Sequence, residues 1–194
     1  MPIRLVHDRW IDKYTERPVS ALADLKAELE GTDMPTQENV STTTQVHRVF
    51  IKAAPEAIWA AITKPEWSER YGYGGRVEYD LRPGGRFRTV ATAEMQAGGM
   101  PEEVVTGEVV EADPPHRLVQ TWQAAWETEP ATRLTYEITS GQGGVSVLTV
   151  THDVTGAPNT AAMVAGQVEG AGGGWAEVLS GLKTLLETGA SLYG

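Results

Sequence analysis

The chain has 194 residues, and 16 Lys and Arg against 26 Asp and Glu give it a formal net charge of −10 at pH 7. One domain with an appended element suits this length. A chain this acidic lacks the basic surface that displaces counterions from the phosphates of a nucleic acid. We therefore expect no nucleic-acid partner. The absence of cysteine excludes disulfides, thiolate zinc sites and a cysteine nucleophile.

The sequence predicts no membrane span and no secretion signal. Its longest apolar run is six residues, Ala57 to Ile62, whereas a helix needs about 20 to cross a bilayer. Arg4, Asp8 and Arg9 stand where a signal peptide would be apolar. We therefore expect a cytoplasmic protein with no membrane partner.

Residues 1–30 are predicted to form an amphipathic helical arm, followed by a polar linker over residues 31–44. Leu22, Leu25 and Leu29 recur at helical spacing and give the arm one apolar stripe. Such a stripe must be buried, either on the arm's own domain or on a second copy of the chain. Homodimers are the commonest oligomers. A homodimer formed through residues 8–30 is therefore one of two open alternatives.

Residues 45–190 are predicted to form the main domain, which begins with a strand and two short helices. The strand covers Gln45–Ala53, and Pro55 then suits the first turn of a helix. Thr63-Lys64-Pro65-Glu66 has the S/T-x-x-E pattern of a capping box. It predicts a second short helix that carries Trp67 and Tyr71.

Strands separated by turn residues make up the rest of the domain, up to a final helix. The six further strands are predicted at Val77–Leu81, Arg86–Ala93, Glu103–Glu111, His116–Ala124, Ala131–Thr139 and Val145–Asp153. The final helix has an apolar stripe formed by Trp175, Val178, Leu179, Leu182, Leu185 and Leu186. Hairpin connections make the sheet antiparallel and curved. The predicted fold is therefore α+β, with about six to seven strands wrapped around the long C-terminal helix.

Five segments between Val46 and Glu187 carry a family resemblance: VFIKAAPEAIWAAIT, PGGRFR, GEVVEADPPHRLVQTW, LTVTHD and GGGWAEVLSGLKTLLE. In this order they resemble the family named for the activator of the heat-shock-protein-90 ATPase, within the SRPBCC superfamily. The resemblance implies a START-like helix-grip fold with a hydrophobic cavity under the last helix. It implies less about activity, because this fold hosts many functions. The first 30 residues resemble the dimerising helices of arsenic-repressor-type regulators, but no winged helix is present.

The sequence contains no established catalytic, metal or cofactor motif. H-E-x-x-H, the P-loop and G-x-S-x-G are all missing, and the four histidines fall at no metal-ligand spacing. The glycine-rich stretches 72–75 and 170–174 lack the βαβ context of a dinucleotide site. The second stretch instead favours a close approach of the backbone to the sheet. We therefore expect neither metal nor cofactor.

His152 shares strand parity with apolar residues, so it should point to the inner face of the sheet. It is either a rim histidine hydrogen-bonded to backbone or water, or an imidazole that orients a ligand or acts as a general base. Gln120 and Tyr136 are polar tips in apolar rows, typical of a small-molecule site or of a satisfied core. If the protein is an enzyme, the acid–base candidates are His152, Tyr136 and Glu127.

The predicted ligand-binding residues combine strand aromatics with residues of nearby loops. They are Tyr71, Tyr73, Phe87, Met95, Gln120, Trp122, Trp126, Tyr136, His152, Met163 and Gln167. We expect Met95 and Met100 to flank a flexible segment at the cavity mouth, and Met163 and Gln167 to form a lid. The predicted function is the binding or carriage of a small hydrophobic molecule, aromatic or lipid-like, without catalysis. The alternatives are a protein-interaction module, chaperone-related or the sensor part of a regulator, and a cyclase- or hydrolase-type enzyme.

Overall fold

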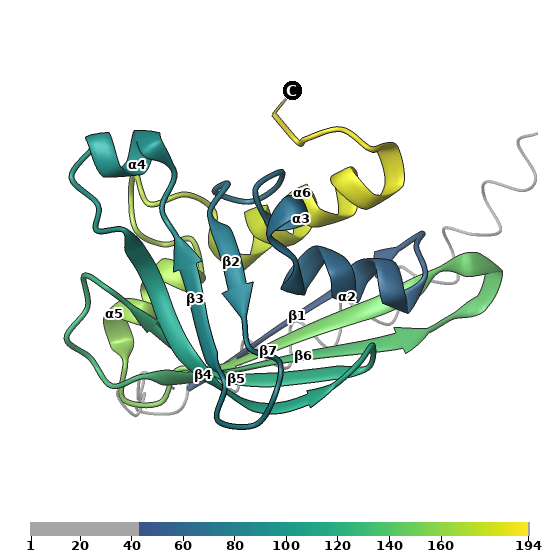
Figure 1. The fold of residues 1–194 in the computed structure, drawn as a ribbon, viewed down its shortest axis with the longest axis horizontal. Coiled ribbons are helices and arrows are strands. Elements are labelled where there is room, and N and C mark those ends of the chain that lie inside the picture. The colour runs from purple at the N-terminus through teal and green to yellow at the C-terminus, as the bar shows by residue number, and fades with distance from the viewer. Residues whose placement is uncertain (1–42, 194) are drawn as a thin grey trace, which may run out of the picture. The chain divides into compact units, whose positions relative to one another are not determined.

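The computed structural model describes residues 43–193, which contain a seven-stranded antiparallel sheet (Figure 1). The strands are β1 Thr44–Ile51, β2 Arg76–Tyr79, β3 Arg86–Val90, β4 Glu103–Asp113, β5 Arg117–Ala124, β6 Thr132–Ser140 and β7 Ser146–Asp153. Their spatial order is β1-β7-β6-β5-β4-β3-β2, so β1 and β2 form the two edges. Register shifts in the β3–β4 and β4–β5 pairs mark irregularities of the kind that bend a sheet.

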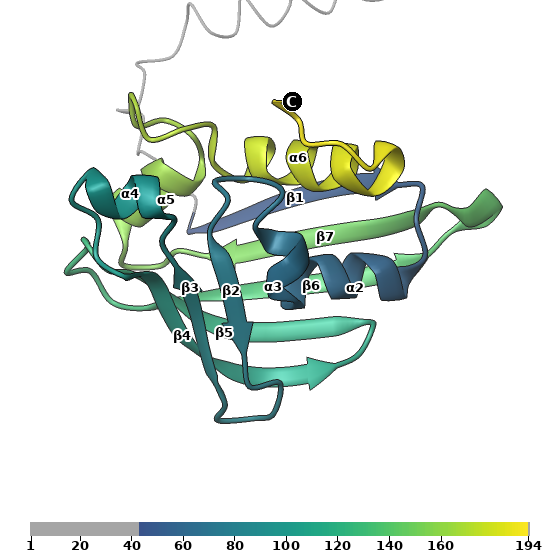
Figure 2. The same ribbon diagram turned by 45° about the horizontal axis from the view of Figure 1, so that its top comes forward.

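The helices are inserted between these strands and after the last one. They are α2 Pro55–Thr63, α3 Pro65–Ser68, α4 Ala93–Ala97, α5 Pro158–Val164 and α6 Gly174–Thr188, with a 3-10 turn η1 at Gln142–Gly144. Figure 2 shows α2 and α6 side by side over the same face of the sheet. The long C-terminal helix therefore shares the inner face with α2.

The core lies between this inner face and the two helices. Leu118, Leu134 and Leu148 from three neighbouring strands are completely buried, because alternate residues of a strand point to the same face. Ile58 of α2 and Leu182 of α6 pack against them from above. Burying a side chain of this size contributes about 1.5–3 kcal/mol, so one apolar stripe per helix is enough to hold it on the sheet.

The predicted α+β helix-grip fold is confirmed, with the strands and the last helix in the expected order. The prediction of a capping box at Thr63 is wrong. Thr63 is the last residue of α2, its hydroxyl donates to the Trp59 carbonyl oxygen, and Lys64 is the N-cap of α3 without a side-chain bond. Helix α3 ends at Ser68, so Tyr71 lies beyond it.

Two segments for which the sequence predicted no helix are helical. The segment around Met95 contains α4, in which the Thr92 hydroxyl accepts a hydrogen bond from the Met95 N–H at 3.1 Å. The segment around Met163 contains α5. Both helices are short, and a short helix has little stability of its own.

The predicted arm over residues 1–30, its dimer contact through residues 8–30, and most of the 31–44 linker lie outside the described residues. Thr44 already belongs to β1, so the first strand starts one residue earlier than expected. Within residues 43–193, no helix combines the length and the apolar character needed to cross a bilayer.

Candidate functional site

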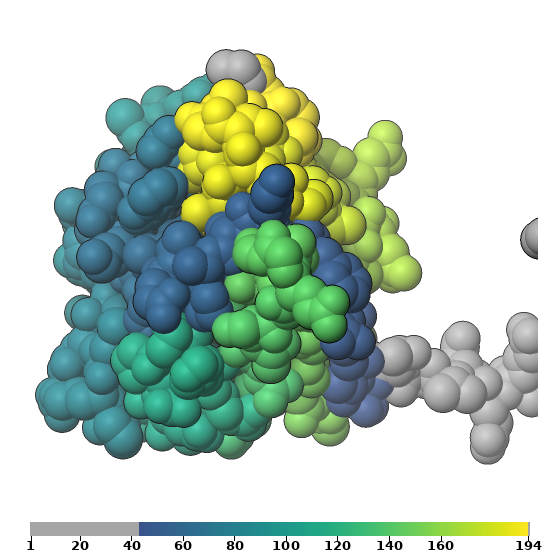
Figure 3. All heavy atoms as spheres, turned by 90° about the vertical axis from the view of Figure 1, so that its right-hand side faces the viewer, coloured from purple at the N-terminus to yellow at the C-terminus, as the bar shows by residue number. Residues whose placement is uncertain are grey.

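A cavity of about 690 Å³ lies under the N-terminal half of α6, which contributes Gly174, Trp175 and Val178 to its wall. Buried and half-buried residues form its deep end, among them Ile62 and Tyr136. Figure 3 looks onto the end of the domain where α2, the β6–β7 hairpin and the C-terminal half of α6 meet, and this face shows no deep hollow.

The mouth of the cavity is formed by α4, α5 and the loops that follow β5 and precede α6. Tyr73, Met100 and Trp126 line the cavity and are also 45%, 41% and 44% exposed. Met95 and Met163 complete this rim from α4 and α5. Methionine side chains are flexible and polarisable, so the rim can adapt to ligands of different shape.

Besides Tyr73 at the rim, three tyrosines line the cavity: Tyr71, Tyr79 and Tyr136. The Tyr71 hydroxyl donates to the Ala61 carbonyl oxygen at 3.1 Å, and the Tyr79 hydroxyl donates to Oε1 of Gln120 at 2.8 Å. The Tyr136 hydroxyl has no hydrogen-bond partner among residues 43–193. Burial raises the pKa of all three hydroxyls, so each stays protonated at neutral pH.

Gln120 of β5 is buried behind Tyr79 and does not line the cavity. Its Oε1 accepts the bond from Tyr79, while its Nε2 is buried without a partner among the described residues. A buried amide nitrogen without a partner carries a desolvation cost of about 1–3 kcal/mol. Gln120 therefore positions the Tyr79 ring and adds an unused donor to the layer below the cavity.

His152 of β7 is completely buried, and both of its ring nitrogens are engaged. The Trp175 indole N–H donates to its Nδ1 at 3.1 Å, which makes Nδ1 an acceptor. Its Nε2 lies 2.7 Å from the Thr132 hydroxyl, which itself donates to the Trp122 carbonyl oxygen at 3.0 Å. Nε2 must then carry the proton, so this chain of bonds fixes one neutral tautomer.

The surroundings of His152 keep it uncharged. Burial lowers the pKa of His152 to about 4, although the charge of Asp153 acts in the opposite direction. Its ring also contacts Trp122 and Trp175 edge-on, with ring centroids 5.5 Å and 5.9 Å away. His152 therefore supports two tryptophans that line the cavity and does not reach the cavity itself.

Two glutamates of the β5–β6 loop hold the N-terminus of α5 beside the mouth. The Glu129 carboxylate accepts the backbone N–H groups of Asn159 and Thr160 at 2.8 Å and 2.9 Å. Desolvation acts to raise the pKa of Glu129, but these donors outweigh it and the pKa lies below its ordinary value. The Glu127 carboxylate accepts from the Asn159 side chain at 3.3 Å and does not line the cavity.

The structure brings most of the predicted ligand-binding residues to one cavity. Seven of them line it: Tyr71, Tyr73, Met95, Trp122, Trp126, Tyr136 and Met163. Four do not: Phe87, Gln120, His152 and Gln167. Phe87 stacks under Tyr79 with ring centroids 4.6 Å apart, and Gln167 is exposed to solvent.

Sequence reasoning missed several lining residues, above all Tyr79, Val178 and Trp175. Trp175 belongs to the apolar stripe predicted for the last helix, yet it also lines the cavity and donates its indole N–H to His152. The role of Glu129 has no local signal, because its partners lie about 30 positions away in the sequence. Within residues 43–193, no group of three acidic, His or Cys side chains is arranged to hold a metal ion.

Several solved structures have a fold similar to that of this chain. A protein of Rhodobacter sphaeroides is 26% identical with a TM-score of 0.57, and the match covers 75% of this chain and 93% of that one. An HSP90 activator from Plasmodium falciparum is 20% identical with a TM-score of 0.54, covering 74% and 96%. DynU16, a protein of the dynemicin biosynthetic locus, is 21% identical with a TM-score of 0.57, covering 77% of this chain.

The match covers only part of the length of some similar proteins. The chain spans 49% of DynU16 and 59% of CalU16 from Micromonospora echinospora. No curated protein matches the sequence. Residues 52–187 match the family described as activator of Hsp90 ATPase homolog 1-like protein. The match covers well over half of the chain and includes both α2 and α6, and the chain therefore belongs to this family.

Proposed function

We propose that this domain binds and carries a small hydrophobic molecule, aromatic or lipid-like, in the cavity under α6 without transforming it. The observation that carries the proposal is the cavity itself. Its volume of about 690 Å³ lies within the 300–1,000 Å³ typical of small-molecule sites. Aromatic and methionine side chains form much of its wall, and its polar side chains are few: the tyrosine hydroxyls, Ser68, Thr89 and Glu169.

The titratable groups around the cavity favour carriage over catalysis. A general acid or base works best with a pKa near the operating pH and with access to the substrate. The pKa of Tyr136 is raised well above its ordinary value, and that of His152 is lowered to about 4. Both ring nitrogens of His152 are hydrogen-bonded to protein groups, and Glu127 does not line the cavity.

The fold of a protein from the dynemicin biosynthetic locus is compatible with this proposal. At 21% identity the likeness concerns the fold alone and indicates no particular ligand.

A fluorescent neutral probe, N-phenyl-1-naphthylamine, tests the proposal together with a matched pair of variants. Val178 lines the cavity on α6, whereas Ser180 is exposed on the same helix. We expect saturable binding to the wild type, at least tenfold weaker binding to Val178→Phe, because the larger ring occupies the cavity, and unchanged binding to Ser180→Phe. Fluorescence that does not saturate, or equal binding to both variants, would contradict the proposal.

A further inference from the structure

The cavity wall is nearly free of charge. Among the described residues that line it, Glu169 has the one carboxyl group, and no Lys, Arg or His contributes. A carboxylate placed inside would lose its hydration without gaining a positive partner. The wall therefore disfavours anionic ligands.

The segments around the mouth reinforce this effect. Residues 93–102, 124–130 and 154–174 contain five glutamates, Glu94, Glu102, Glu127, Glu129 and Glu169, and neither lysine nor arginine. Their negative charge repels an approaching anion, and the whole chain adds a net charge of −10.

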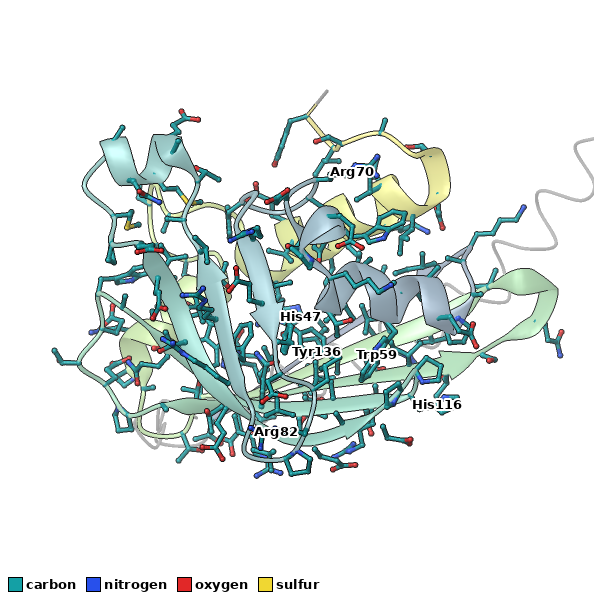
Figure 4. The ribbon with its side chains drawn as sticks, in the orientation of Figure 1. His47, Trp59, Arg70, Arg82, His116 and Tyr136 are labelled. Atoms are coloured by element: carbon teal, nitrogen blue, oxygen red, sulfur yellow. The ribbon has the colours of Figure 1, made fainter. Side chains whose placement is uncertain are left out.

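The arginines near the sheet are engaged elsewhere. Figure 4 shows Arg70 beside α6 and Arg82 at the β2–β3 turn, on opposite sides of Tyr136 and away from it. Arg70 donates to the Gly189 carbonyl oxygen, and Arg82 pairs with Asp80. Arg88 is held between Glu78 and Glu103. These contacts hold the three arginine side chains outside the cavity, where they do not meet a ligand.

At the deep end, Tyr71 and Tyr79 donate their hydroxyl protons to protein acceptors, whereas the Tyr136 hydroxyl has no acceptor among the described residues and can donate to a ligand. The fourth lining tyrosine, Tyr73, lies at the rim, where its hydroxyl accepts the Gly174 N–H. The Tyr136 ring is fixed edge-on against Trp175, with ring centroids 6.0 Å apart, so the position of its hydroxyl is defined. An uncharged acceptor such as a carbonyl oxygen matches this neutral donor.

We propose that the cavity selects uncharged apolar molecules that carry a carbonyl-type acceptor oxygen, which accepts a hydrogen bond from Tyr136, and that it rejects the corresponding carboxylates. This inference rests on the proposed function, because it specifies the ligand of the same cavity.

Three naphthalenes that differ in one substituent test it: 2-acetylnaphthalene, 2-ethylnaphthalene and 2-naphthoate. Each is titrated at pH 7.5 against the full chain with bound N-phenyl-1-naphthylamine, and competition gives the Kd. We expect the ketone to bind tightest, the hydrocarbon roughly 2- to 10-fold more weakly for want of one hydrogen bond, and the carboxylate at least tenfold more weakly than the ketone.

Two variants locate the donor. Tyr136→Phe should abolish the preference for the ketone over the hydrocarbon and leave the Kd of the hydrocarbon within twofold, which also shows that the variant is folded. Tyr71→Phe removes a hydroxyl that already serves Ala61, so it should keep the preference.

The outcomes separate the two proposals. Carboxylate binding as tight as that of the ketone overturns the selection for uncharged ligands, while binding as such upholds the proposed function. A ketone preference that survives in Tyr136→Phe overturns the assignment of Tyr136. Failure of all three compounds and of the probe to bind the wild type overturns the proposed function and this inference with it.

Discussion

His152 is a buried polar residue that the fold tolerates because each ring nitrogen has a partner of the right kind. Trp175 supplies a donor to Nδ1, and Thr132 receives the proton of Nε2. Protonation would put two donors face to face at Nδ1 and would place a charge among apolar side chains. The neutral form is therefore part of the folded structure, and the two tryptophans beside the ring depend on it.

This arrangement predicts a specific pH dependence of stability. The folded pKa of His152 is about 4, below the ordinary 6.5, so the unfolded chain binds the proton first as the pH falls. The contribution is fully present above pH 6.5 and is lost as the pH drops toward 4. Between pH 7.5 and 4.5 the loss from this residue is about 2–3 kcal/mol.

The variant His152→Gln tests this dependence, because an amide does not titrate. Urea unfolding from pH 7.5 to 4.5 should show the free energy of unfolding of the wild type falling more steeply than that of the variant, by about 2–3 kcal/mol over the range. The carboxylates and His47 are present in both proteins, so their contribution to the pH dependence cancels in the difference between the two curves. Parallel curves for the two proteins would show that His152 is not held neutral.

At the scale of elements, local patterns predict the strands, the long helix and the two short helices after β1, but not α4 and α5. Alternating apolar residues and turn residues define seven strands, and the apolar stripe of α6 repeats from Trp175 to Leu186. Helices α4 and α5 have five and seven residues, too few for a periodic signal, and α5 is capped by Glu129 from a distant loop. Their stability comes from tertiary contacts, which a local pattern does not contain.

The cavity residues were partly predictable, because local patterns fix which face of a strand a side chain lies on but not what covers it. Strand parity brings Trp122 and Tyr136 to the inner face, and both line the cavity. Parity also brings Gln120 and His152 there, but Tyr79 covers the first and Trp175 engages the second. Which inner-face residue reaches the cavity depends on which side chain lies above it, and that is set by contacts between distant elements.

The glycine run before α6 was expected to pass close to the sheet, but its tight contact is with α5. Gly174 has φ +61°, and a Cβ there would lie 2.2 Å from the Val164 carbonyl oxygen. Gly170 has φ +77° and would have nothing within 4 Å of an added Cβ. A side chain at Gly170 would meet only the strain of a positive φ, whereas one at Gly174 would also collide with the backbone of α5.

Alanine at each position makes this difference measurable. Gly170→Ala should cost about 1 kcal/mol, from the positive φ alone. Gly174→Ala should cost more than about 3 kcal/mol, because the start of α6 must move away from α5 as well. Chemical denaturation of both variants checks the prediction, and equal losses would mean that the approach of α6 to α5 is not tight.

At the scale of the whole molecule, residues 43–193 contain both edges of the sheet, the core and the cavity. We therefore expect a protein that begins at Thr42 to fold, because it retains both sheet edges and the core. It should also bind N-phenyl-1-naphthylamine with the same affinity. A truncated protein that fails to fold would show that residues 1–41 complete the core.

Sedimentation of the same two proteins tests the predicted arm. A dimer contact through residues 8–30 requires that the full chain sediments as a dimer and the truncated chain as a monomer. An arm that docks on its own domain requires that both are monomers.

An NMR titration that follows the methionine methyl groups tests whether the cavity under α6 binds a ligand. Three of the five methionines, Met95, Met100 and Met163, line the cavity from α4, the loop after it, and α5. Titration with 2-acetylnaphthalene should shift these three methyl resonances saturably and with one common Kd. Resonances that stay unchanged while the compound binds elsewhere, or no binding at all, would contradict the account.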